Sequence, residues 1–471
     1  MLKQQKAKIN IMRSEKVRRH LILYLFFTLF VSVSSIYGKA KYVFYFIGDG
    51  MGVNVINITE TYLSAVNGER GSKSLLMTQF PVATFSTTYS TNADITDSAA
   101  SGTALATGEK TTNSTLGLDP EGNTIETVAE KAKKAGNKVG IATTVTINHA
   151  TPAAFYAHQK KRSSYYEISH DLLASGFDFF GGAGFSNAKD IYTLVEDAGY
   201  TVSKGYKDFS TNARNSKKVI LVHEDWEKSG GIPYNIDRTE HDLTLKQITE
   251  AAIDVLTKDN KKGFFLMIEG GKIDGGGHGN DGATMIKEVI DMDEAIQVAF
   301  DFYKKHPKET LIVITADHDT GGVSYISNNM IQNLQYQQYS QNVLSEKMNK
   351  LMEAKNNKVS WEDIKSLLSE TMGFWKEVPI SWENEKILRD TFEETIAKNK
   401  DDKDVNLYAE NKLLAAKAKE ILNSISGLTW ATRSHTNGYV PVFVIGEGQE
   451  LFTHKMDNAD LPLKIIKAAK Y

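Results

Sequence analysis

Residues 41–52 read KYVFYFIGDGMG, a nearly continuous apolar run that ends in a turn where Asp49 stands among glycines. An apolar run that does not alternate with polar residues predicts a strand buried on both faces, as in a parallel sheet covered by helices. Ligands of such open α/β sheets bind at the carboxyl ends of the strands. Asp49 is therefore a candidate site residue, although taken alone it is explained more simply as the cap of the next helix.

The same pattern returns twice further along the chain. Residues 262–271 (KGFFLMIEGG) deliver Glu269 into a glycine turn, and residues 310–317 (TLIVITAD) end in Asp317. Two further apolar strands are expected, at residues 138–144 and 439–446. Strands that alternate with helical segments predict an α/β fold with a central, mostly parallel sheet flanked by helices. Each carboxylate has a simple explanation alone, but three apolar strands that all end in one predict a shared site.

A serine among small residues is the second candidate feature. Residues 97–104 read DSAASGTA, and the alanines favour a helix whose first residues include Ser98. The start of a helix presents free N–H groups and the positive end of its dipole, which favour an anion. Ser98 is therefore a candidate nucleophile whose alkoxide or phosphate ester would be stabilised there. The alternative is an ordinary capping serine.

Histidines and further polar residues gather next to the same strands. They are His149 and Thr151 after residues 138–144, Asp274 and His278 in a glycine-rich loop after Glu269, His318 after Asp317, and His435 before residues 439–446. The chain has no cysteine, so a metal site must use imidazole and oxygen ligands, which suit zinc and magnesium. A pair of ions can clamp the attacking and leaving oxygens of an in-line displacement at phosphorus. Arg162, in a basic cluster, looks by itself like a surface residue.

The composition changes in the later part of the chain. Residues 328–427 are rich in Lys, Asn, Gln, Glu and Ser, and residues 360–363 (SWED) resemble a capping box. Helices are expected at residues 342–355, 360–371, 382–398 and 408–425. We expect residues 39–471 to form a single domain that carries a helical insertion at about 328–427. The charge of the insertion fits a lid or rim over a site, or simply a solvated decoration.

The first 38 residues form a distinct segment. Basic residues from Lys3 to Arg19 precede the apolar run of residues 21–31, and small residues follow as far as Gly38. This order predicts a secretory signal peptide over residues 1–38, and therefore a periplasmic or extracellular protein. A retained membrane anchor is the alternative, but the apolar run is short for a bilayer span, so no stable anchor is expected.

Charge excludes one class of function. The 471-residue chain has 55 basic and 58 acidic side chains, a formal net charge of −3. Residues 1–38 hold seven of the basic residues and one acidic residue, Glu15, so the remaining chain is more acidic still. A nucleic-acid-binding protein needs a basic face, so no nucleic-acid binding is expected.

Several dispersed motifs together resemble the alkaline phosphatase family. They are Gly-Asp49-Gly-Met-Gly, Asp97-Ser98-Ala-Ala, His149-Ala-Thr151-Pro-Ala-Ala, Glu269-Gly-Gly-Lys-Ile-Asp274 with His278, Ala-Asp317-His318 and Ser434-His435-Thr436. The resemblance implies a three-layer α/β sandwich and a homodimer. It also implies metal-dependent hydrolysis of small phosphate monoesters, to an alcohol and inorganic phosphate, through a phosphoserine on Ser98.

The resemblance also implies a role for each candidate residue. One Zn²⁺ would be held by Asp274, His278 and His435. A second Zn²⁺, next to the Ser98 oxygen, would be held by Asp49, Asp317 and His318. Asp49 would also bridge to one Mg²⁺ completed by Thr151 and Glu269. Arg162 would grip two phosphoryl oxygens, as the planar guanidinium group allows.

Two departures from the family pattern affect these expectations. His149 stands where many bacterial members have aspartate, and this difference bears on which ion fills the third site. Gly275, Gly276 and Gly277 follow Asp274 where some members carry a large side chain, so a more open site is expected.

Other functions lie close to this one. Relatives in the same superfamily include phosphodiesterases, phosphonate hydrolases and sulfatases. Sulfatases need a Cys/Ser-x-Pro-x-Arg motif, which this chain lacks. Diesterases commonly use threonine as the nucleophile and have no arginine that corresponds to Arg162. A secreted metal- or phosphate-binding protein without turnover would explain the ligands, but not a serine at a helix start beside them.

Overall fold

A computed structural model describes residues 38–188, 190–225, 231–326, 330–397 and 407–471. The predicted signal segment therefore lies, apart from Gly38, outside the described residues. Within the described part of the chain, no helix is both long enough and apolar enough to cross a membrane.

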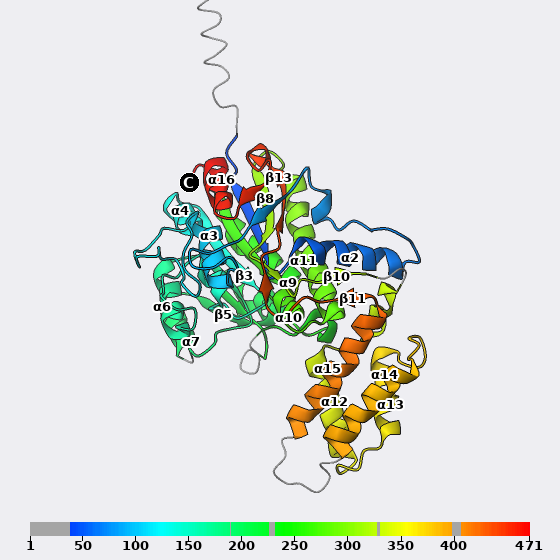
Figure 1. The fold of residues 1–471 in the computed structure, drawn as a ribbon. Coiled ribbons are helices and arrows are strands. Elements are labelled where there is room, and N and C mark those ends of the chain that lie inside the picture. Colours follow the sequence, from blue (N-terminus) through cyan, green and yellow to red (C-terminus); the bar gives the residue numbers. More distant parts are fainter. Residues whose placement is uncertain (1–37, 189, 226–230, 327–329, 398–406) are drawn as a thin grey trace, which may run out of the picture.

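A ten-stranded sheet runs through the centre of the molecule (Figure 1). Its strand order is β14-β2-β13-β8-β1-β7-β3-β4-β6-β5. In chain order these strands are β1 (Tyr42–Gly48), β2 (Val82–Thr87), β3 (Lys138–Thr143), β4 (Phe179–Gly182), β5 (Thr201–Lys204), β6 (Val219–Val222), β7 (Phe264–Gly270), β8 (Thr310–Ala316), β13 (Val440–Gly446) and β14 (Met456–Asp457). Strand β13 is antiparallel to both of its neighbours, and the other pairs are parallel. The predicted mostly parallel sheet is confirmed.

The register of the central strands brings their carboxyl ends level. Gly48 of β1 pairs with Gly270 of β7 and with Ala316 of β8, and every residue of these three strands is buried. The residues that end or follow these strands therefore meet at one edge of the sheet. This is why three turns far apart in the sequence supply one site.

Strand β13 reaches the same edge from the opposite direction. Because it runs antiparallel to β8, its first residues lie beside the end of β8. Just before β13, the short strand β12 (His435–Thr436) pairs with β9 (Asp319–Thr320). His435 is thus carried to the carboxyl edge although it precedes its strand.

Helices cover both faces of the sheet, as the three-layer prediction requires (Figure 1). Along β1, Phe44 and Phe46 join the core under α2 (Val53–Val66), α9 (Leu245–Thr257) and α11 (Gly282–Lys305). Val43 and Tyr45 join the opposite core, under α3 (Ser98–Thr107), α4 (Val128–Lys134) and α16 (Asp460–Ala469). The remaining α-helices of this body are α5 (Ala150–Ala153), α6 (Tyr165–Ser175), α7 (Ile191–Asp197), α8 (Gly205–Asp208) and α10 (Lys272–His278).

The later helices stand apart from this body (Figure 1). They are α12 (Gln341–Ala354), α13 (Trp361–Met372), α14 (Trp382–Phe392) and α15 (Leu407–Ile425). The expected helices agree with these bounds to within one residue, except that α14 ends early and continues as a π-helical turn, Glu393–Ala397. At the base of these helices, β10 (Ser324–Tyr325) pairs with β11 (Leu428–Thr429). The chain segments before and after the four helices are therefore held side by side.

Candidate active site

Three groups of carboxylates and histidines lie at the carboxyl edge of the sheet, and in each group the possible ligand atoms are within 4.8 Å of one another. We call them the inner cluster (Asp49, Asp317, His318), the outer cluster (Asp274, His278, His435) and the third cluster (Asp49, His149, Glu269). Asp49 belongs to both the inner and the third cluster, so one carboxylate can bridge two ions. The structure thus brings together residues that the sequence spreads over almost 400 positions.

The inner cluster is completely buried. The Nε2 atom of His318 lies 3.4 Å from Asp49 Oδ1 and 3.2 Å from Asp317 Oδ2, and all three side chains are fully shielded from solvent. Burial, and then the charges of neighbouring carboxylates, raise the pKa values of Asp49 and Asp317 well above the usual range. Burial also lowers the pKa of His318. The fold therefore disfavours charge on all three groups unless a counter-charge is present.

Orphaned oxygen atoms indicate what that counter-charge is. Asp49 Oδ1, Asp317 Oδ2 and Glu269 Oε1 are buried and have no hydrogen-bond partner among the described residues. An unpartnered buried carboxylate oxygen is costly, and a bound cation removes that cost. With imidazole and carboxylate oxygen as the available donors, the site fits zinc or magnesium.

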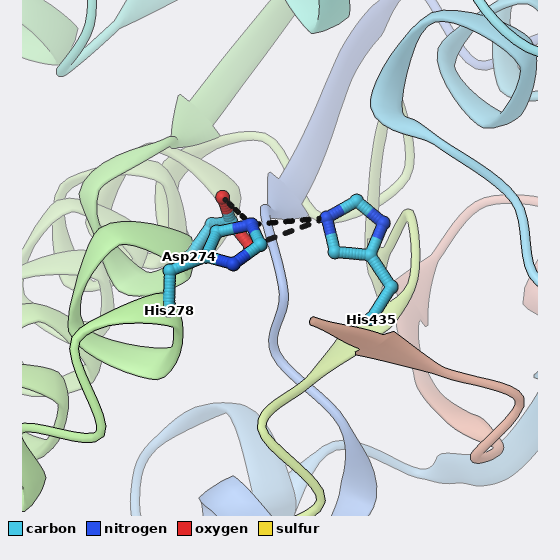
Figure 2. Close-up of side chains that lie close together, drawn as sticks. All are labelled: Asp274, His278 and His435. Carbon is cyan, nitrogen blue, oxygen red and sulfur yellow. Dashed lines mark hydrogen bonds and ion pairs between the residues drawn. The ribbon is translucent and has the colours of Figure 1, made fainter. Parts of the chain in front are cut away.

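The outer cluster joins a helix to a short strand (Figure 2). His278 Nε2 lies 3.3 Å from Asp274 Oδ2 and 3.2 Å from His435 Nε2. Each histidine has a carbonyl oxygen beside its other nitrogen: His278 Nδ1 donates to Arg433 O at 2.6 Å, and His435 Nδ1 donates to Thr96 O at 2.9 Å. Because both Nδ1 atoms must carry a proton, the two Nε2 atoms are the ones that face the cluster, and a metal ion would bind them in place of a proton.

The local structure of the outer cluster differs from the sequence prediction in one way. Asp274 and His278 were expected in a loop, but they lie on α10, where a spacing of four residues puts them on one helix face. The three glycines between them lie close to neighbouring elements. A β-carbon at Gly275 would lie 2.4 Å from the Tyr234 hydroxyl oxygen, and one at Gly276 would lie 2.8 Å from the Met285 backbone. These glycines allow α10 to pack closely against Tyr234 and Met285.

The third cluster lies between the inner cluster and β3. Thr151 Oγ1 donates to Asp49 Oδ2 at 3.4 Å, and Thr143 donates a hydrogen bond to Glu269 Oε2. Burial raises the pKa of Glu269 to about 7. Burial and the charge of Arg162 lower the pKa of His149 to about 4, so His149 offers a neutral imidazole. All the residues predicted for a third ion are present here.

Ser98 lies beside the inner cluster at the first position of α3. Its Oγ is 3.2 Å from His318 Nε2. Asp97 caps the helix, since its side chain accepts a hydrogen bond from Ala100 N at 3.0 Å. The helix start predicted for Ser98 is confirmed, and its hydroxyl points toward the ligand atoms rather than acting as the cap.

Arg162 extends toward the same region and is not a free surface residue. One guanidinium nitrogen donates to Asp97 Oδ2 at 3.2 Å, and the other lies 3.2 Å from His149 Nε2. The backbone N–H of Arg162 donates to Ser114 O at 2.8 Å, which fixes the turn that carries it. The side chain is therefore held between the capping aspartate of α3 and the third cluster.

Some site residues were not found by sequence reasoning. Thr320 Oγ1 donates to Asp274 Oδ1 at 2.6 Å and lies 3.2 Å from His318 Nδ1, so it touches the outer and inner clusters together. Asp319 accepts a hydrogen bond from Thr436 Oγ1 at 2.5 Å, which ties the loop of His318 to the strand of His435. The only available signal was their position directly after Asp317-His318.

Comparisons with known proteins agree on one family. The family model described as alkaline phosphatase matches residues 40–178 and 188–471. Alkaline phosphatase 3 of Bacillus subtilis (strain 168) is 33% identical over 445 residues, which cover 92% of this chain and 90% of that protein.

Two solved structures extend the agreement to the fold. The cold-active alkaline phosphatase of Shewanella sp. matches with a TM-score of 0.76 and 27% identity, over 91% of this chain and 99% of that chain. A variant of the TAB5 alkaline phosphatase, with a histidine replaced by aspartate and Mg bound in the M3 site, matches with a TM-score of 0.63 and 25% identity, over 92% of this chain and 99% of that chain.

Proposed function

Since this chain belongs to the alkaline phosphatase family, we propose that its metal-dependent hydrolysis of phosphate monoesters proceeds through a phosphoserine on Ser98. The observation that carries this proposal is the position of the Ser98 hydroxyl. It stands at the start of α3, 3.2 Å from His318 Nε2, next to buried carboxylate oxygens that have no other partner among the described residues. A serine in that position faces the metal ligands and the free N–H groups of a helix at the same time.

The three clusters would hold three ions. Asp274, His278 and His435 would bind one Zn²⁺, and Asp49, Asp317 and His318 the other. Asp49, Thr151 and Glu269 would bind Mg²⁺. When bound, the ions supply positive charge that lowers the pKa of an alcohol and stabilises the charge of phosphoryl transfer.

The chain's own residues carry out the two transfer steps. Attack by Ser98 Oγ in line with the ester oxygen forms a new P–O bond while the ester P–O bond breaks, and the alcohol leaves. Attack by water on the phosphoserine then releases inorganic phosphate and restores Ser98. Arg162 would hold two phosphoryl oxygens through both steps, since its planar guanidinium group matches that geometry.

Arg162 also supports the choice of monoesters over diesters. A monoester offers the guanidinium group one more charged oxygen than a diester does. Arg162→Ala should therefore slow a monoester more than a diester, as measured by kcat/KM for an aryl phosphate and for the matching diester. An equal loss on both substrates would contradict this role.

Loss of aryl phosphate hydrolysis with a chelator, and its return with added zinc, would separate the enzyme from a binding protein without turnover.

His149 is proposed to set the ion in the third cluster. The neutral imidazole favours zinc, whereas a carboxylate can order the water shell that Mg²⁺ keeps. The TAB5 variant with aspartate in place of a histidine and Mg in its M3 site supports this reasoning. His149→Asp should shift the third ion toward Mg²⁺ and change activation by added Mg²⁺. Identical metal content and Mg²⁺ response in the two proteins would show that residue 149 does not select the ion.

Export, assembly and domain organisation complete the proposal. Residues 1–38 would direct the protein out of the cytoplasm, so sequencing of the exported protein should begin between Ile36 and Tyr42. A mature cytoplasmic protein that retains Met1 would contradict this.

Residues 39–471 would form one catalytic domain with its helical insertion at about 328–427. The exported protein would be a homodimer, which light scattering in solution tests directly.

A further inference from the structure

The helical insertion is joined to the outer cluster through α15. The point of contact is the turn that follows α10, where residues 279–281 lead from His278 to the start of α11. Lys419 of α15 donates a hydrogen bond from Nζ to Gly279 O. Asn423, one turn later on the same helix, donates to Asn280 O at 2.6 Å. The insertion is therefore hydrogen-bonded to the two residues that directly follow His278, a predicted metal ligand.

Lys419 is an unusual residue to find at such a contact. Its side chain is completely buried, and it forms no ion pair with a carboxylate among the described residues. Its second hydrogen bond, 2.7 Å long, goes to the amide oxygen Oε1 of Gln341 on α12. Burial of a cation without a paired anion is costly, and a methionine would fill the same space more cheaply. The two oxygen contacts are what the lysine adds, and one of them is to the end of α10.

A second connection reaches His278 from its other side. Glu420, next to Lys419 on α15, pairs with Arg433 at 3.0 Å. The carbonyl oxygen of the same Arg433 accepts the hydrogen bond from His278 Nδ1. Glu420 and Arg433 are about half exposed, so their ion pair is a weak restraint, and the buried contacts of Lys419 and Asn423 are the strong ones.

Asn423 also fixes the start of the helix that follows. Its Oδ1 accepts a hydrogen bond from Gly282 N at 3.4 Å, at the first residue of α11. A β-carbon at Gly282 would lie 3.0 Å from Asn423 Oδ1 and 2.3 Å from Leu428, so the glycine permits this close approach. The turn between α10 and α11 is therefore clamped at both ends by one face of α15.

We propose that Lys419 and Asn423 are positioning residues, through which the insertion holds His278 in place for metal binding at the outer cluster. The inference rests on the proposed assignment of that cluster as a zinc site. It gives the insertion a function in the reaction that is neither that of a lid nor that of a solvated decoration. Second-layer contacts of this kind commonly change metal affinity by about 10- to 100-fold when they are removed.

The test is the zinc affinity of each site in the intact protein. Zinc bound per chain is measured by mass spectrometry across a series of buffered free-zinc concentrations, for wild type, Lys419→Met, Asn423→Ala and Lys412→Met. The last variant is a matched control, because Lys412 lies on the same helix with its side chain exposed to solvent. His278→Ala identifies which of the bound ions belongs to the outer cluster.

We expect Lys419→Met to weaken one ion by about 10- to 100-fold, the same ion that His278→Ala removes, while the others bind as in wild type. Lys419→Arg, which keeps the charge and the donors, should recover part of that affinity. Asn423→Ala gives an independent reading if Lys419→Met does not fold. Wild-type affinity in both variants would overturn the inference, as would an equal weakening of all ions. If His278→Ala removes no ion, the metal assignment itself fails.

Discussion

The inner and outer clusters contain the same ligand types but are built in different surroundings. The inner cluster stands at the ends of the central strands β1 and β8, and its three side chains have no exposed surface. The outer cluster stands on the seven-residue helix α10 and the two-residue strand β12, and the His278 side chain is 43% exposed. This difference in burial determines how the ligand charges of each cluster are balanced when no cation is bound.

The outer cluster neutralises itself, whereas the inner one does not. Burial opposes the charge on Asp274, but the hydrogen bond with His278, the charges of His318 and His278, and the hydrogen bond from Thr320 together hold the pKa of Asp274 below the usual range. The same hydrogen bond raises the pKa of His278 to about 9. In the inner cluster, the charge of Asp317 raises the pKa of Asp49, and the opposing charge of Arg162 does not offset burial and the neighbouring carboxylates. We therefore expect ion binding at the inner cluster to be coupled more strongly to folding.

The largest expected effect comes from Asp317→Asn. This substitution should reduce monoester hydrolysis by about a hundredfold or more, because a carboxylate that faces the reacting groups is lost. It should also raise the thermal stability of the metal-free protein at pH 8, since it removes one of two buried like charges. Unfolding curves with and without zinc, together with steady-state kinetics, measure both effects.

His278→Gln is the matched change in the outer cluster and should have the opposite effect on the metal-free protein. It breaks the pair with Asp274, so stability should fall, by at most about 1 kcal/mol because the histidine is partly exposed. If Asp317→Asn lowered metal-free stability as His278→Gln does, the contrast between the clusters would be wrong.

The order of metal release is the next test of the comparison. The ion at the outer cluster should leave first during chelation, because His278 is exposed while the inner ligands are not. Activity should fall together with this first ion. Zinc release followed with a chromogenic chelator, with residual activity measured in parallel, gives the order. Simultaneous release of all ions would show that the difference in burial has no kinetic consequence.

Glu269 and His278 should each lower the stability of the metal-free protein as the pH rises, in adjoining pH windows. Burial raises the pKa of Glu269 in the third cluster to about 7, so the fold favours its protonated form, and stability falls as the pH rises from about 4.5 to about 7. The stabilisation from protonated His278 is full below about pH 6.5 and is lost as the pH rises to about 9. Urea unfolding across pH should show Glu269→Gln reducing the loss in the first window, to which Asp49 and Asp317 also contribute, and His278→Gln reducing the loss in the second. A single shared window would contradict these assignments.

The smallest expected effect concerns Asp97, which belongs to neither cluster. Asp97→Ala removes the cap of α3 and the carboxylate partner of Arg162, and should cost about 1 kcal/mol of stability. The zinc affinity of both clusters should stay as in wild type. A selective loss of one ion would show that the start of α3 supports the cluster that binds it. The difference between the inner and outer clusters would then not depend on their own ligands alone.

The strands and most of the ligands could be predicted because each is a local pattern. An apolar run that ends in a carboxylate identifies β1, β7 and β8 and, with them, Asp49, Glu269 and Asp317. The helical form of α10 could not be predicted, because three glycines oppose a helix and the contacts that stabilise it come from Tyr234, Met285 and Thr320. The hydrogen bonds of Thr320 to Asp274 and of Lys419 to Gly279 depend on register and docking, which no local pattern contains.

The central claim is that Ser98 carries the phosphoryl group, and acid quenching tests it most directly. The enzyme is mixed with an aryl phosphate, stopped in acid, digested, and the peptide that contains residues 97–104 is analysed by mass spectrometry. The account predicts phosphate on Ser98 in wild type, none in Ser98→Ala, and an activity loss in that variant of about a hundredfold or more with its metals still bound. Phosphate on another residue, or full activity in Ser98→Ala, would contradict the account.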